Sequence, residues 1–120
     1  QGEGHNVGTP SLFIRFSGCN LWSGRDTDRH RDARRNGVEC PKWCDTDFFN
    51  GRKASISDIN KMSDVAPPEV RLIVLTGGEP LLQADEELCS FLKGKFSKAA
   101  VAVETNGTVL PKTRFDWVYT

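Results

Sequence analysis

The sequence carries no net charge and has no long hydrophobic run. Its 120 residues include 16 Lys and Arg against 16 Asp and Glu, so the formal net charge is zero. Balanced charge excludes a strong overall attraction to nucleic acid or to an anionic membrane surface. No apolar stretch approaches the roughly 20 residues that a membrane-spanning helix needs, and no secretory signal is visible. We therefore expect a cytoplasmic protein that binds neither nucleic acid directly nor a membrane.

Cysteine is scarce, with four residues in the chain, and their positions bear on metal binding. Without an export signal, cysteines serve more often as metal ligands or catalytic groups than as disulfide partners. Cys19, Cys40 and Cys44 lie in one polar stretch. Cys89 lies on the apolar face of a predicted helix, where it is expected to be buried as a small hydrophobic residue.

Three cysteines in one stretch leave two kinds of metal site open. Thiolates are soft ligands that suit both zinc and iron–sulfur clusters. A structural zinc site takes four protein ligands, and His5 or His30 could supply the fourth. Three thiolates alone would leave one iron of a [4Fe–4S] cluster available to a small molecule. The spacing by itself does not decide between these sites.

Segments typical of strands and of helices alternate along the chain, which predicts an α/β fold with parallel strands. The expected strands span residues 11–16, 71–75, 99–103 and 116–119, and the expected helices span residues 55–62 and 83–96. A long polar loop, from about residue 17 to residue 53, follows the first strand, and loops of this length are often functional. Within it, the mixed-charge run 25–35 is expected to be a solvated insertion.

Three unusual segments each follow a predicted strand. They are the cysteine loop, the run 76–80 (TGGEP) and the run 104–108 (ETNGT). The carboxyl ends of parallel strands meet at one edge of the sheet, where such folds bind their ligands. The glycines of TGGEP permit close approach of two backbones, and Glu79 supplies a carboxylate that could bind an ammonium group. The sequence therefore predicts a site at this edge.

Together these motifs resemble the radical S-adenosylmethionine superfamily and, within it, the 7-carboxy-7-deazaguanine synthases with an expanded cysteine loop. The cysteine loop, the aromatic Trp43 beside Cys44 and the Gly-Gly-Glu-Pro run carry the broader resemblance. The finer resemblance lies in five stretches, in order along the chain: residues 1–4, 15–25, 44–48, 76–83 and 104–108.

The resemblance implies a fold, cofactors and a reaction. Residues 1–120 would be the N-terminal part of one core domain, a partial (βα) barrel with parallel strands. Cys19, Cys40 and Cys44 would hold a [4Fe–4S] cluster whose open iron binds S-adenosylmethionine, and Mg²⁺ would bind near the substrate. The lyase reaction would contract 6-carboxy-5,6,7,8-tetrahydropterin to 7-carboxy-7-deazaguanine, a precursor of queuosine-type bases. A flavodoxin or ferredoxin would supply electrons. The resemblance is also compatible with a homodimer.

The resemblance also assigns residues to these ligands, with no catalytic side chain beyond the cluster and S-adenosylmethionine. Five residues would contact S-adenosylmethionine: Trp43, Cys44, Asp45, Gly78 and Glu79. Four would contact the pterin: Gln1, Gly2, Arg15 and Thr76. Thr46 would bind Mg²⁺, a cation that takes oxygen ligands, and Arg15 can offer a carboxylate two hydrogen bonds. Without the resemblance, a surface ion pair for Arg15 and a loop cap for Thr46 are the simpler interpretations.

The chain departs from the family pattern in two ways. Cys40 and Cys44 are separated by three residues rather than two, so Cys19 and Cys44 are the firmer ligands. The family is also longer, so we expect residues 1–120 alone to be poorly folded and inactive. Two alternatives stay open, another radical S-adenosylmethionine enzyme such as a glycyl-radical activase, and a zinc-stabilised binding module.

Overall fold

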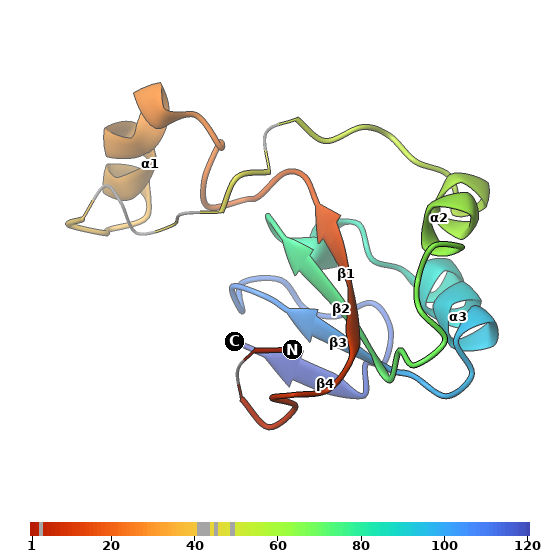
Figure 1. Cartoon of the computed structure of the whole chain (residues 1–120). Coiled ribbons are helices and arrows are strands. Elements are labelled where there is room, and N and C mark those ends of the chain that lie inside the picture. The colour runs from red at the N-terminus through yellow and green to blue at the C-terminus, as the bar shows by residue number, and fades with distance from the viewer. Residues whose placement is uncertain (3, 41–43, 45, 49) are drawn as a thin grey trace.

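A four-stranded parallel sheet, in the order β1-β2-β3-β4, forms the centre of the computed structural model. The structure describes all residues except 3, 41–43, 45 and 49 (Figure 1). The strands are β1 Ser11–Phe16, β2 Leu72–Gly77, β3 Ala100–Glu104 and β4 Trp117–Tyr119. The helices are α1 Arg29–Arg35, α2 Ile56–Ser63 and α3 Glu86–Lys95, with short 3-10 turns η1 Asp26–Asp28 and η2 Pro80–Leu82. The α/β class with parallel strands is confirmed, and sequential strand order is what part of a (βα) barrel requires.

Local sequence signals account for where the helices begin. Ser55 caps α2, since its side chain accepts a hydrogen bond from the Asp58 backbone and Asp58 accepts one from the Ser55 backbone at 2.9 Å. Asp85 caps α3 by accepting from Leu88 N at 2.9 Å. The expected start of this helix at residue 83 is therefore too early, because η2 and the Asp85 cap come first.

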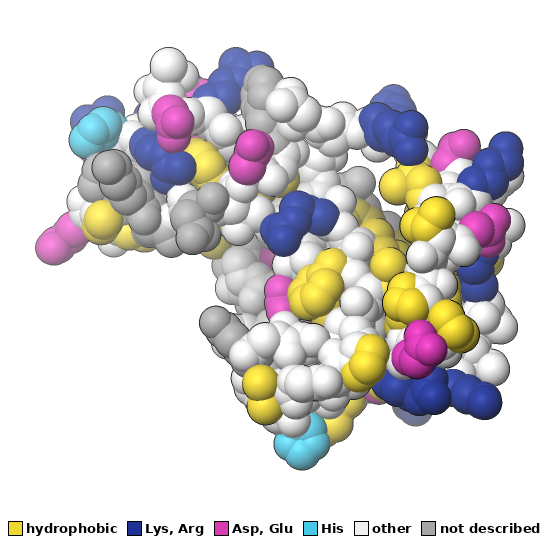
Figure 2. All heavy atoms as spheres, in the orientation of Figure 1, with side chains coloured by type: hydrophobic (Ala, Val, Ile, Leu, Met, Phe, Trp, Pro, Cys, Tyr) yellow, Lys and Arg dark blue, Asp and Glu magenta, His cyan; other side chains and the backbone are white. Residues whose placement is uncertain are grey.

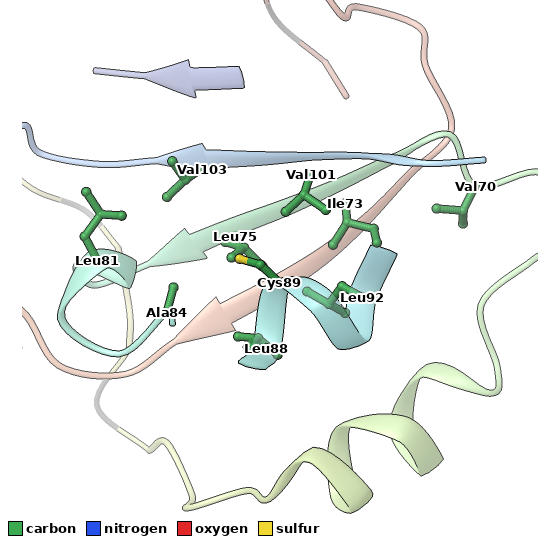
Figure 3. Close-up of a cluster of buried hydrophobic side chains, with 10 residues drawn as sticks. All are labelled: Val70, Ile73, Leu75, Leu81, Ala84, Leu88, Cys89, Leu92, Val101 and Val103. Carbon is green, nitrogen blue, oxygen red and sulfur yellow. The ribbon is translucent and has the colours of Figure 1, made fainter. Parts of the chain in front are cut away.

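The main core lies between the sheet and α3, with α2 packed beside it (Figure 1). Side chains alternate along a strand, so every second residue of β2 and β3 faces the helices. Figure 3 shows Ile73 and Val101 on this face of the sheet, opposite Leu92 and Cys89 of α3. Cys89 is buried as predicted, and burial raises the pKa of its thiol. Its position in the core leaves Cys19, Cys40 and Cys44 as the candidate metal ligands.

The opposite face of the sheet carries polar side chains at the carboxyl ends of the strands. Arg15 is paired in register with Thr76, and Glu104 is paired with Tyr119. Because their strand neighbours face the helices, these four residues lie on the other face. The N-terminal segment covers part of it, with the His5 ring stacked 4.7 Å from the Trp117 ring.

The long loop after β1 contains a small folded unit that extends away from the sheet (Figure 1). Trp22 is buried, its ring meets Phe48 edge-on at 5.4 Å, and the Arg29 guanidinium lies 4.2 Å from its centroid. Asp32 is also buried and accepts from Ser23 N at 2.8 Å, a hydrogen bond that lowers the pKa of the carboxyl. We call this unit the satellite core. Most of the run 25–35 is exposed, as the expected solvated insertion requires, but Asp32 and Ala33 are buried in this unit.

The surface matches the balanced composition. Figure 2 shows Lys and Arg side chains interspersed with Asp and Glu over the visible face. Within the described part of the chain, the longest helix is far too short and polar to cross a bilayer.

Candidate functional site

The turn after β2 lies directly against the backbone that leads to Cys19. Gly78 N donates to Phe16 O at 2.9 Å, and Glu79 N donates to Gly18 O at 2.8 Å. A Cβ atom added to Gly78 would lie 2.0 Å from Gly18 O, and Gly77 has a φ of +114°. Only glycine tolerates both conditions, so the predicted close backbone approach at TGGEP is confirmed.

Glu79 holds this turn to the loop that follows β3. Its side chain is fully buried. One carboxylate oxygen accepts from Leu81 N at 2.9 Å and from Thr105 Oγ1 at 2.8 Å, and the other accepts from Asn106 N at 2.8 Å. The carboxylate therefore links two loops through hydrogen bonds. Its contact with the ammonium group of S-adenosylmethionine stays a prediction.

Replacing Glu79 with glutamine is expected to lower the free energy of unfolding by about 2–4 kcal/mol. An amide presents N–H groups where the carboxylate accepted hydrogen bonds, so at least one buried donor loses its acceptor. Chemical denaturation of the protein measures the loss. Glu87→Gln, an exposed position in the first turn of α3, is the matched control and should change stability by less than about 0.5 kcal/mol. Equal effects of the two variants would contradict the role of Glu79 in linking the two loops.

A cavity of about 460 Å³ opens at this edge of the sheet. It is lined by residues from several separate segments, among them Gln1, Thr46, Thr76 and Gly78. These four were assigned from the sequence to the substrate, Mg²⁺ and S-adenosylmethionine. The structure therefore brings a predicted substrate, metal and cofactor residue into one hollow.

Glu104 organises the polar side of the cavity, and sequence reasoning gave it no role. Its carboxylate accepts from Thr76 Oγ1 at 2.7 Å and from Gln1 Nε2 at 3.1 Å. Tyr119 and Asn106 also line the cavity and were likewise missed. One sequence feature could have identified Glu104 and Asn106 as site residues. Both lie in the run ETNGT, directly at the end of a predicted strand.

Arg15 and Gly2 lie outside this set of lining residues. Arg15 lines a neighbouring hollow of about 240 Å³ with Ser17 and Phe48. Gly2 N donates to the side chain of Gln1 at 2.8 Å. Two predicted cofactor residues, Trp43 and Asp45, fall among the positions that the structure does not describe.

The thiol chemistry fits an iron–sulfur cluster. Cys19, Cys40 and Cys44 are all free thiols. The Cys19 sulfur accepts from Leu21 N at 3.4 Å and from Asn106 Nδ2 at 3.7 Å, and N–H donors to sulfur are a usual feature of cluster ligands. Over residues 4–40, 44, 46–48 and 50–120, no three Cys, His, Asp or Glu side chains gather as a metal site. The three cysteines are thus available as donors but are not drawn around one point.

Comparison with known proteins gives the same family that the motifs resemble. No family model matches the chain. The 7-carboxy-7-deazaguanine synthase of Bradyrhizobium diazoefficiens is 44% identical over 127 residues, covering 98% of this chain and 56% of the relative. Those of Bordetella pertussis and Bacteroides thetaiotaomicron are 41% and 37% identical, with 98% of this chain and 56% and 53% of the relative covered.

The chain spans about half the length of the curated relatives that it matches. The matched region covers 98% of the chain in each comparison, so the cysteine loop, TGGEP and ETNGT all lie within the length compared. Over nearly its whole length, therefore, this chain is homologous to the 7-carboxy-7-deazaguanine synthases.

Proposed function

We propose that this chain is part of a radical S-adenosylmethionine synthase that converts 6-carboxy-5,6,7,8-tetrahydropterin to 7-carboxy-7-deazaguanine, on the route to queuosine and related 7-deazapurines. One observation carries the proposal. Gln1, Thr46 and the pair Thr76 and Gly78 come from three separate segments and line one cavity at the carboxyl edge of the sheet. The relatives are themselves 7-carboxy-7-deazaguanine synthases by name, which supports the same activity.

The polar side chains at the carboxyl ends of the strands, on the sheet face opposite the helices, suit a pterin that carries a carboxylate. Because Thr76 Oγ1 donates its proton to Glu104, its lone pairs stay available to hydrogen-bond donors on a ligand ring. Arg15, in register with Thr76, would bind the substrate carboxylate through two parallel hydrogen bonds. Thr46 would offer a hard oxygen ligand to Mg²⁺ beside that carboxylate.

Cys19, Cys40 and Cys44 would hold the [4Fe–4S] cluster, and Gly78, Glu79 and residues 43–45 would hold S-adenosylmethionine. The two groups together would supply the radical that removes a hydrogen atom from the pterin before the ring contracts with loss of ammonia. A low-potential donor in the reducing cytoplasm, such as a flavodoxin or ferredoxin, would supply the electron. The chain's own residues would bind and orient the pterin and hold water out of the cavity.

The test is anaerobic turnover of the complete protein with reductant, S-adenosylmethionine and 6-carboxy-5,6,7,8-tetrahydropterin, followed by mass spectrometry. We expect 7-carboxy-7-deazaguanine to accumulate and to depend on every component. Formation of deoxyadenosine without the deazapurine would support a radical S-adenosylmethionine enzyme and contradict the proposed pterin substrate. A colourless protein with one equivalent of zinc would instead support the zinc-stabilised binding module.

A further inference from the structure

Asn106, in the loop after β3, has no role in the reaction proposed above, yet its side chain reaches the cysteine loop. Its Nδ2 lies 3.7 Å from Cys19 Sγ and donates to Asn20 Oδ1 at 3.0 Å. Its Oδ1 accepts from Thr108 N at 3.0 Å and from Thr108 Oγ1 at 2.6 Å. The donor end of the amide therefore faces Cys19, while the acceptor end closes its own turn.

This orientation of the amide is fixed by its partners. The Thr108 backbone N–H can only donate, so the Asn106 atom that faces it must be the oxygen. Asn20 Nδ2 donates to Thr108 Oγ1 at 2.7 Å, which leaves the Asn20 oxygen to accept from Asn106. The Asn106 backbone is itself held by the buried Glu79 carboxylate at 2.8 Å. A reversed amide would place oxygen against oxygen and N–H against N–H.

We propose that Asn106 is a positioning residue for Cys19, and that its N–H···S contact orients the thiolate and raises the reduction potential of the cluster. An N–H donor reduces the negative charge on sulfur, which favours the more negative, reduced cluster. Leu21 N donates to the same sulfur at 3.4 Å, so Asn106 supplies the side-chain donor of a pair. The inference rests on the proposed function, because it requires a cluster at Cys19.

Three variants separate the hydrogen bond from charge and from loop folding. Asn106→Asp keeps the oxygen that accepts from Thr108 and removes the N–H that faces Cys19. Asn106→Ser removes the same donor without adding charge, and its hydroxyl can still accept from the Thr108 backbone. Asn20→Asp, the matched control, adds a charge next to Cys19 and loses the donor to Thr108 Oγ1. It keeps the oxygen that accepts from Asn106 Nδ2 and the hydrogen bonds that Asn106 makes with Glu79 and the Thr108 backbone.

The measurement is the midpoint potential of the anaerobically reconstituted protein, followed by electron paramagnetic resonance. We expect both Asn106 variants to shift it to more negative values, by about tenfold in the ratio of reduced to oxidised cluster, or about 59 mV for one electron. Asn20→Asp should shift it clearly less. Equal shifts in Asn20→Asp and Asn106→Asp, or no shift in Asn106→Ser, would overturn the role of Asn106 and leave the proposed function standing. A wild-type protein that takes up zinc instead of iron and sulfide overturns both.

Discussion

Gly78→Ala is expected to lower the free energy of unfolding by about 3–5 kcal/mol, a large share of the 5–15 kcal/mol typical of a domain. The new methyl group would lie 2.0 Å from Gly18 O, a backbone atom that cannot swing aside as a side chain can. Separating the two backbones also weakens the hydrogen bonds from Gly78 N to Phe16 O and from Glu79 N to Gly18 O. The midpoint of chemical denaturation measures the loss.

The same substitution elsewhere in the chain should have the opposite sign. A Cβ atom at Gly94, within α3, would meet nothing within 4 Å. Gly94→Ala is therefore expected to stabilise the protein by about 0.5–1 kcal/mol, because alanine favours helix more than glycine does. A Gly78 variant as stable as the Gly94 variant would show that the two loops can separate without cost.

In the complete protein, Cys19→Ala is expected to remove most of the iron of the proposed cluster and to reduce the proposed synthase turnover by roughly a hundredfold or more, since even residues behind a metal ligand often matter by 10–100-fold. Cys19 is partly buried and its sulfur receives two N–H donors. The next cysteine along the chain is Cys40, so no adjacent residue offers a second thiol at this point of the loop. Iron and sulfide content, measured after anaerobic reconstitution, gives the first readout and turnover gives the second.

Cys89→Ala is the matched control. Cys89 lies in the core against α3 and the sheet, so its loss should reduce stability by about 1–2 kcal/mol and leave the iron content unchanged. Cys40→Ala then tests the third ligand, which the unusual spacing to Cys44 puts in question. If the Cys19 variant retained its iron, Cys19 would not be a cluster ligand. The reason for placing the cluster beside Gly78 would then be lost.

The sheet and the helices that cover it were predictable because their signals are local. The apolar run from Ser11 to Phe16 forms β1 with the expected bounds, and the serine cap places the start of α2. The satellite core was missed because α1 has no apolar stripe of its own. Arg29 of α1 lies against the Trp22 ring, which in turn contacts Phe48. Both aromatic residues lie outside the charged run and come together only when the loop folds.

The site was predictable in its place but only partly in its members. The carboxyl ends of parallel strands fix the edge, and the structure brings Gln1, Thr46 and Thr76 to it. The role of Glu104 depends on which strand lies beside β3 and in what register, and sequence periodicity contains neither. For the same reason, the sequence could not show that the Glu79 carboxylate would accept hydrogen bonds from the loop after β3.

The satellite core has a consequence for how this loop can change. Its aromatic pair and the buried Asp32 stabilise it from within, and α1 stands apart from the sheet in Figure 1. A unit of this kind can lengthen or shorten without altering the register of β1 against β2, because each doubling of a flexible loop adds only about 0.6 kcal/mol of closure entropy. The segment between Cys19 and Cys40 is thus a place where insertions and deletions can be tolerated while Cys19 keeps its hydrogen bond from Asn106 of the loop after β3.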